Sequence, residues 1–155
     1  MRSRKPAAQQ AHQRLRTFDQ FAYSLVAVRS LRIGSEIGQN APRDRRIDLV
    51  GKVDLLTAAT VLRRCAFFIG NDTGLMHIAA ASETPTLGLF GPSPSNQYAP
   101  WGRHTAVVQS TDRPEQMFGP GFDHRTTDTL MDGLSVEAVE AAAHQLWGSI
   151  ARSAA

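Results

Sequence analysis

The chain of 155 residues is poor in cysteine, in aromatic residues and in long apolar runs, and these shortages exclude several classes of protein. Cys65 is the only cysteine, so no intramolecular disulfide can form, and its apolar neighbours indicate a small core residue. No apolar run approaches the roughly 18 residues of a membrane-spanning helix. The histidines lack the paired spacing of metal ligands, so we expect no metal site and no cofactor. GxSxG and GxxxxGK[ST] motifs are absent, which leaves serine hydrolases and P-loop enzymes unsupported.

Charge is unevenly distributed along the chain. Residues 1–50 hold ten Lys or Arg and four Asp or Glu, a net charge of +6, whereas residues 51–155 hold seven and ten, a net charge of −3. A basic segment can face nucleic acid, a phosphorylated substrate or an anionic membrane, or it can be a solvated arm. Residues 1–16 lack apolar periodicity and are interpreted as a disordered basic arm. Few aromatics accompany the arginines, so we expect no nucleic-acid partner.

The centre of the chain, AFFIGNDTGLMHIAAASETPTLGLFG, has the pattern of a parallel crossover unit. Its two short apolar runs, Ala66–Gly70 and Thr86–Gly91, are bounded by Gly and Pro and predict buried strands. Between them, Gly74–Ala81 is built mostly of small and apolar residues and predicts a short helix close to the sheet. Ligands in such folds bind beyond the carboxyl ends of the strands, where the helices begin. The turn from Asn71 to Gly74 falls at that place.

The residues of this turn suit a nucleotide-sugar diphosphate. A helix that begins at Gly74 points backbone N–H groups and a positive dipole end at an anion, and Gly lets the ligand approach closely. The hydroxyl of Thr73 can donate a hydrogen bond to phosphate, and the carboxylate of Asp72 can accept hydrogen bonds from sugar hydroxyls. His77 can bring a positive charge near the phosphates. The same residues have a purely structural interpretation, because Asp and Thr are common helix caps and single histidines are commonly packed or solvated.

The remaining segments alternate between helix and strand patterns. Helices are expected at 18–28, at 55–64 and from a capping Ser135 onward, and strands at 31–34, 47–50 and 105–109. Asp54 is expected to cap the second helix, with Arg63 and Arg64 in its last turn. That helix is predicted to bury Leu55, Leu56, Ala59 and Leu62; the last helix is predicted to bury Val136, Val139, Ala143, Leu146 and Ile150. This alternation predicts an α/β fold, a Rossmann-like doubly wound parallel sheet over residues 17–150.

The central motif closely resembles the ADP-heptose:lipopolysaccharide heptosyltransferases, the family 9 glycosyltransferases. The matching pattern, D-[ST]-G-x-x-H-x-A-A followed by P-T and F-G-P, is carried by Asn71–Ala81, Pro85–Thr86 and Leu89–Pro92. Ile47–Lys52, Gly34–Glu36 and Tyr98–Gly102 are also similar to segments of that family. The resemblance covers about residues 31–150.

The resemblance implies a metal-independent, inverting sugar transfer in a GT-B fold, with this chain as the C-terminal half. By position, Asp72 would bind sugar hydroxyls, Thr73, Gly74 and Leu75 would contact the diphosphate or sugar, and His77 would lie near the phosphates. Glu36 would hold the ribose and Val53 would line the adenine pocket. The substrate would be a nucleotide sugar such as ADP-heptose. Transfer to a glycolipid in lipopolysaccharide core synthesis would make the enzyme cytoplasmic, with peripheral contact to the inner membrane.

The chain is too short for both GT-B domains. The acceptor domain and its general base would be missing, so no catalytic residue is expected here and the chain alone should be inactive. The exposed interdomain face would then favour self-association. The last helix packs across to the other domain in this fold, so Trp147 would lack its partner surface there. The alternative is a non-catalytic, truncated binding or interaction module that keeps the fold.

Overall fold

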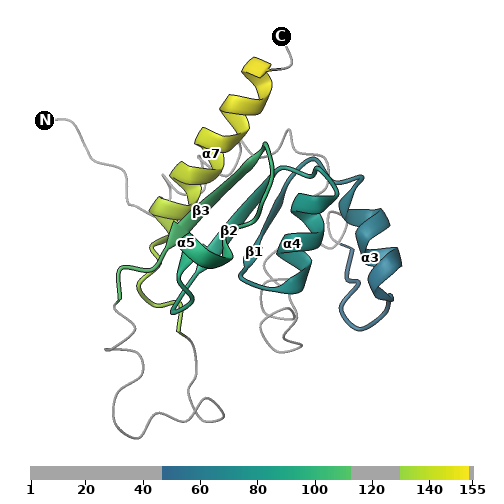
Figure 1. Ribbon diagram of the computed structural model, residues 1–155, viewed down its shortest axis with the longest axis horizontal. Helices are drawn as coiled ribbons and strands as arrows, with labels where there is room; N and C mark the ends of the chain where they lie inside the picture. The colour runs from purple at the N-terminus through teal and green to yellow at the C-terminus, as the bar shows by residue number, and fades with distance from the viewer. Residues whose placement is uncertain (1–46, 113–129, 154–155) are drawn as a thin grey trace, which may run out of the picture.

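The computed structural model describes residues 47–112 and 130–153, which form a parallel sheet with helices on both faces (Figure 1). The sheet order is β1-β2-β3, and both pairs of neighbours are parallel. The strands are β1 (Phe68–Asn71), β2 (Thr86–Phe90) and β3 (Thr105–Gln109), and the helices are α3 (Leu55–Leu62), α4 (Gly74–Ala81), α5 (Ser95–Tyr98) and α7 (Val136–Ser153). The predicted α/β fold is confirmed. The predictions for Glu36 and for residues 1–16, 18–28 and 31–34 concern residues outside the described ranges.

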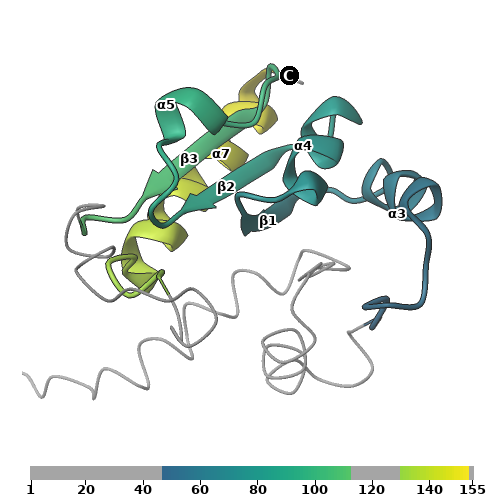
Figure 2. The ribbon, with the colours of Figure 1, turned by 60° about the horizontal axis from the view of Figure 1, so that its bottom comes forward.

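Alternate side chains of the strands build two separate cores. On one face, Phe68 and Phe90 pack with Leu62 of α3 and with Met76 and Ala79 of α4, a cluster that we call the α4 core. On the other face, Leu87 packs with residues of α7, and the partly buried aliphatic side chains of all three strands surround it. Figures 1 and 2 show α4 and α7 on opposite sides of the sheet. Period-two alternation in each strand therefore explains why the sheet needs a helix on both faces.

Two glycines make room for the side chains that pack between the sheet and α4. Gly70 and Gly88 are partners in the register of β1 and β2. A Cβ atom at Gly70 would stand 2.7 Å from Cζ of Phe68, and one at Gly88 would stand 2.7 Å from Sδ of Met76. The side chains of the α4 core thus occupy the space that these two glycines leave empty.

Helix α4 matches its predicted bounds and ends in a Schellman motif. The amide of Thr84 donates to the carbonyl of Ala79 and the amide of Glu83 donates to that of Ala80, both at 3.0 Å. Glu83 takes the left-handed conformation that this motif requires, with φ of 63°. The hydroxyl of Thr84 then donates to the carbonyl of Leu62 at 2.8 Å, which ties the end of α3 to the loop after α4.

Helix α3 differs from its prediction in length and in the face that it buries. Asp54 caps it as expected, because a carboxylate oxygen accepts from the amide of Thr57 at 2.7 Å. The helix ends at Leu62, so Arg63 and Arg64 lie beyond its last turn. Leu62 is buried, but Leu55 and Leu56 are 62% and 81% exposed, so their predicted burial is wrong. Only the C-terminal part of α3 reaches the α4 core.

The predicted strand at 47–50 is absent. Asp48 accepts a hydrogen bond from the amide of Val50 at 3.1 Å, and it pairs with Lys52 at 2.6 Å. This local bonding competes with a strand ladder, and Gly51 completes the turn at φ of 68°. The first central strand also begins later than predicted, at Phe68, whose amide bonds to the carbonyl of Pro85 at 2.8 Å.

Helix α7 confirms its predicted start and most of its buried face. Ser135 caps it by accepting from the amide of Ala138 at 3.1 Å. The predicted apolar positions pack on the sheet except Val136, which is 77% exposed because it stands on the first turn. The ring of Trp147 meets that of Phe67 edge-on, with centroids 6.1 Å apart. Its expected lack of a partner surface on a second domain stays a prediction. No described helix has both the length and the apolar character needed to cross a bilayer.

Candidate functional site

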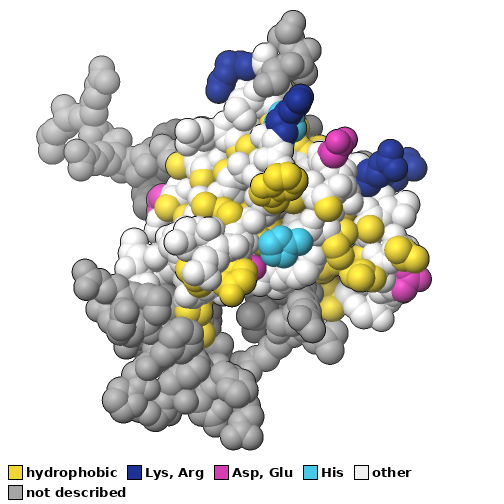
Figure 3. Space-filling view, viewed as in Figure 1, with side chains coloured by type: hydrophobic (Ala, Val, Ile, Leu, Met, Phe, Trp, Pro, Cys, Tyr) yellow, Lys and Arg dark blue, Asp and Glu magenta, His cyan; other side chains and the backbone are white. Residues whose placement is uncertain are grey.

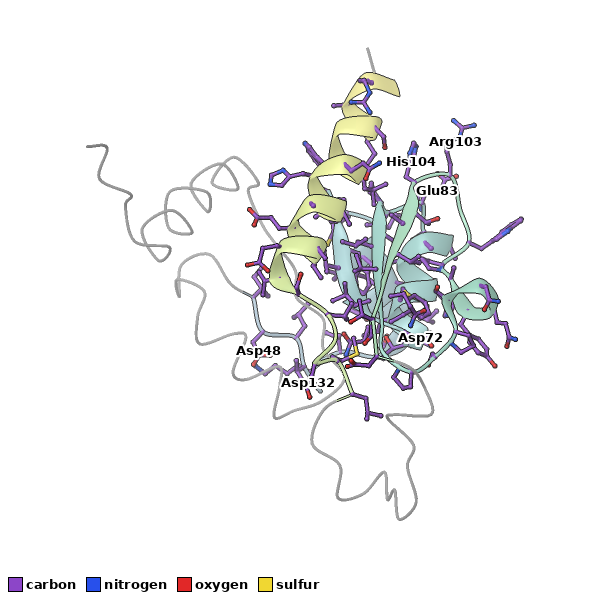
Figure 4. The ribbon with its side chains drawn as sticks, turned by 90° about the vertical axis from the view of Figure 1, so that its left-hand side faces the viewer. Asp48, Asp72, Glu83, Arg103, His104 and Asp132 are labelled. Atoms are coloured by element: carbon purple, nitrogen blue, oxygen red, sulfur yellow. The ribbon has the colours of Figure 1, made fainter. Side chains whose placement is uncertain are left out.

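The candidate site lies at the carboxyl edge of the sheet, where β1 passes into α4. Figure 4 places Asp72 toward the end of the molecule opposite Glu83, Arg103 and His104. Glu83 and His104 precede β2 and β3, so their end is the amino edge of the parallel strands. The turn that the sequence singled out therefore stands at the edge where open α/β sheets bind ligands.

The backbone of Asp72 is held by the sheet. Its amide donates to the carbonyl of Leu89 at 3.1 Å, one step beyond the last register pair of β1 and β2. Its side chain keeps 22% of its surface exposed. The backbone of Asp72 is thus held in place while its carboxylate remains accessible to solvent. A group that binds a sugar hydroxyl needs both properties.

The start of α4 exposes backbone amides. Thr73 is the N-cap residue in extended conformation, and its side chain makes no capping hydrogen bond. Its carbonyl accepts from the amides of Met76 and His77 at 3.0 and 3.4 Å. Helix geometry leaves the amides of Gly74 and Leu75 without an intrahelical acceptor. Gly74 is exposed, and a Cβ atom there would meet nothing within 4 Å, so the space that a side chain would take at Gly74 is open.

The next residues of α4 divide between core and surface. Met76 is fully buried in the α4 core, and Leu75 packs against that core while remaining partly exposed. His77 is 47% exposed, and its Nε2 atom lies 3.8 Å from Oδ1 of Asp72. Figure 3 shows the molecule from the side of α4. Apolar side chains and a histidine are visible there among uncharged groups.

The remaining predicted site residue within the described range is Val53. It is half-buried in the turn that precedes α3. Its role in the adenine pocket stays a prediction, as do the assigned roles of Asp72, Thr73, Gly74, Leu75 and His77. Among the residues that the structure describes, no three His, Cys, Asp or Glu side chains gather closely enough to hold a metal ion.

Gln109 is a residue that the sequence reasoning missed. It ends β3, and its amide nitrogen donates to the carbonyl of Gly91 at 2.6 Å while its amide oxygen accepts from the amide of Ser95 at 3.0 Å. Gln109 therefore bridges both ends of the loop between β2 and α5. A polar residue at the end of an alternating strand resembles a solvated position, so the sequence carries no signal for this role.

The thiol of Cys65 takes no part in this site. Cys65 lies after α3, half-buried, and its Sγ donates to the carbonyl of Val61 at 3.3 Å. Burial raises the pKa of the thiol, which keeps it protonated and unreactive near neutral pH. Cys65 is half-buried and is not among the buried core residues, so its predicted place in the core is not confirmed.

Comparison with known proteins gives one consistent result. A stretch of 71 residues is 42% identical to lipooligosaccharide heptosyltransferase 2 of Haemophilus influenzae and covers 44% of this chain and 20% of that protein. A stretch of 96 residues is 33% identical to lipopolysaccharide heptosyltransferase 3 of Escherichia coli, covering 62% of this chain and 27% of that protein. The matched part thus spans about a quarter or less of these relatives' length.

The structural comparison agrees in fold. A glycosyltransferase of family 9 from Veillonella parvula superposes with a TM-score of 0.65 at 23% identity, over 94% of this chain and 42% of that one. The family model described as glycosyltransferase family 9 (heptosyltransferase) matches residues 25–119, more than half of the chain. The protein therefore belongs to glycosyltransferase family 9.

Proposed function

We propose that this chain binds the nucleotide-sugar donor of an inverting glycosyltransferase, with ADP-heptose or a similar molecule as the donor. The carrying observation is the open turn at the carboxyl edge of the sheet, where Asp72 is followed by the uncapped start of α4. Membership of family 9 and the heptosyltransferase names of the relatives support this choice of donor.

Each part of the turn has a place in the proposed chemistry. The amides of Gly74 and Leu75 and the helix dipole face the diphosphate, whose negative charge grows as the bond to the sugar breaks. The hydroxyl of Thr73, which is not used as a cap, donates to a phosphate oxygen. The carboxylate of Asp72 accepts from sugar hydroxyls and fixes the orientation of the sugar ring.

Transfer also requires a base that removes the proton from the acceptor hydroxyl. We propose that this base and the glycolipid acceptor site belong to a second domain, because the relatives are several times longer than the matched stretch. The chain alone would then bind donor without transferring sugar. Exposed apolar side chains such as Trp101, which is 93% exposed, are candidates for contact with a second copy.

Titration calorimetry on the full chain tests the donor site. The wild-type protein should bind ADP and ADP-heptose, and Asp72→Ala should weaken ADP-heptose binding by about tenfold or more, because a charged hydrogen-bond acceptor is lost. Glu137→Ala is the matched control, since it removes an exposed carboxylate in the first turn of α7 and should leave both affinities unchanged. Thermal unfolding of each variant confirms that it is folded. Equal affinity of wild type and Asp72→Ala for ADP-heptose would contradict the proposal.

A further inference from the structure

His77 faces the carboxylate of Asp72. Asp72 lies in the turn directly after β1, and His77 lies in the first turn of α4. Their Nε2 and Oδ1 atoms are 3.8 Å apart, which is within the range of an ion pair and slightly longer than a hydrogen bond. A hydrogen bond between the two groups requires the imidazole N–H to come closer to the carboxylate oxygen.

The backbone is held in place at both residues of this pair. The amide of Asp72 is tied to Leu89 of β2, and Met76, the residue before His77, is fully buried against the sheet. The sheet and the packing of α4 therefore fix the backbone positions from which the two side chains extend. A contact between groups that are held in this way costs little conformational entropy to form.

A second pair in the chain has the same separation and a different setting. Nε2 of His144 lies 3.8 Å from Oε1 of Glu140, four residues apart on α7. Such spacing brings side chains together on the surface of any helix. The pair of Asp72 and His77, in contrast, spans a strand end and a helix start and lies beside the open space at Gly74. The pair of Glu140 and His144 therefore serves as a control, because it has the same separation and lies away from the candidate site.

The direction of the imidazole bears on the role of His77. Nε2 is the ring nitrogen at the far end of the side chain, and in this structure it faces the carboxylate. A ring nitrogen that donates to Asp72 cannot donate to a phosphate oxygen at the same time. Once one oxygen of Asp72 is engaged, the other is left to accept from a ligand.

We propose that His77 is a positioning residue that acts through Asp72: it holds one carboxylate oxygen so that the other faces the hydroxyls of the donor sugar. This inference rests on the proposed function and makes it more specific, because it assigns His77 to recognition of the sugar and not of the diphosphate. Its signature is the added affinity that the sugar gives to the nucleotide, measured as the ratio of the affinities for ADP-heptose and ADP.

Calorimetry on the full chain tests this assignment with His77→Ala, Asp72→Asn and the double variant. His77→Ala should lower the affinity for ADP-heptose about three- to tenfold while changing that for ADP by less than about twofold. The double variant should bind ADP-heptose no more weakly than Asp72→Asn, because the two residues act as a unit. His77→Gln, whose amide can donate to the carboxylate, should recover part of the loss. His144→Ala is the control and should change neither affinity.

Two results would overturn the assignment and leave the proposed function intact. One is an equal loss of ADP and ADP-heptose affinity in His77→Ala, which would place His77 on the diphosphate. The other is additive losses in the double variant. Absence of any nucleotide binding by the wild type would instead overturn the proposed function, and this inference with it.

A measurement without ligand tests the pair directly. The ¹⁵N NMR signal of the His77 ring should shift in Asp72→Asn, because its charged neighbour is removed, while that of His144 should stay in place. An unchanged His77 signal would show that the two side chains do not interact in solution and would overturn the assignment.

Discussion

Helices α3 and α4 begin in opposite ways, although both are eight residues long. Helix α3 has a capping carboxylate from Asp54 at 2.7 Å and exposes the two leucines of its first turn. Helix α4 has no side-chain cap, yet Met76 in its first turn is fully buried. One helix is thus stabilised at its start by a cap and the other by packing. Packing leaves the first amides of α4 available, and a cap would have occupied one of them.

The largest difference between the two starts should come from their apolar side chains. Met76→Ala should lower the free energy of unfolding by about 2–5 kcal/mol, because it leaves a cavity between α4 and the sheet. Leu56→Ala, in the first turn of α3, should change it by less than about 0.5 kcal/mol, because that side chain is 81% exposed. Urea unfolding of both variants measures the contrast. Similar losses would show that α4 is not held mainly by its packing.

A smaller effect is expected at Gly74, and it should appear in binding. The backbone of Gly74 is ordinary, and a Cβ there meets nothing within 4 Å, so Gly74→Ala should keep or slightly raise stability. The added methyl group would stand beside the exposed amides and should weaken ADP binding by about tenfold. Calorimetry and urea unfolding of the same variant separate the two effects.

Gly70→Ala is the control for this change. Its Cβ would stand 2.7 Å from the ring of Phe68, so it should lower stability. The comparison distinguishes a glycine that the fold requires from one that the site requires. Undiminished ADP affinity in Gly74→Ala would mean that the ligand does not approach the start of α4.

The sequence predicted best the segments whose signal is local. The bounds of α4 and β3 match the prediction because Pro, Gly and alternation mark them directly in the chain. The caps at Asp54 and Ser135 were found for the same reason, since a cap and its partner lie three residues apart. In each case the deciding contact is short in sequence.

The errors concern contacts between distant segments. Periodicity identified an apolar face on α3, but the orientation of that helix against α4 decided that Leu62 is buried and Leu56 is exposed. The edge-on contact between Trp147 and Phe67 joins residues that are far apart in sequence, so no local pattern indicated it. At the site, the sequence named both Asp72 and His77, but their pairing depends on the path of the turn between β1 and α4. The bridge made by Gln109 depends on sheet order in the same way.

The smallest expected effect belongs to the cap of α3 and appears with pH. Hydrogen bonds from Thr57 hold the pKa of Asp54 below its ordinary value of 3.8. A carboxylate with a lowered pKa in the folded state contributes stability above its unfolded pKa and loses it as pH falls through the folded pKa. Asp54→Ala should therefore lower the urea midpoint slightly at pH 7, and the difference from wild type should shrink below the ordinary carboxyl pKa.

Two further variants separate this small effect of Asp54 from the effects of other titrating groups. Asp54→Asn keeps a capping oxygen without a charge, so its difference from Asp54→Ala should stay constant between neutral and acidic pH. Thr73→Ala, at the equivalent position of α4, should show no such pH-dependent difference from wild type, because its side chain makes no capping bond. A midpoint difference for Asp54→Ala that persists unchanged in acid would mean that the charge of the carboxylate contributes nothing to the cap, and that α3 is stabilised at its start by the hydrogen bond from Thr57 alone.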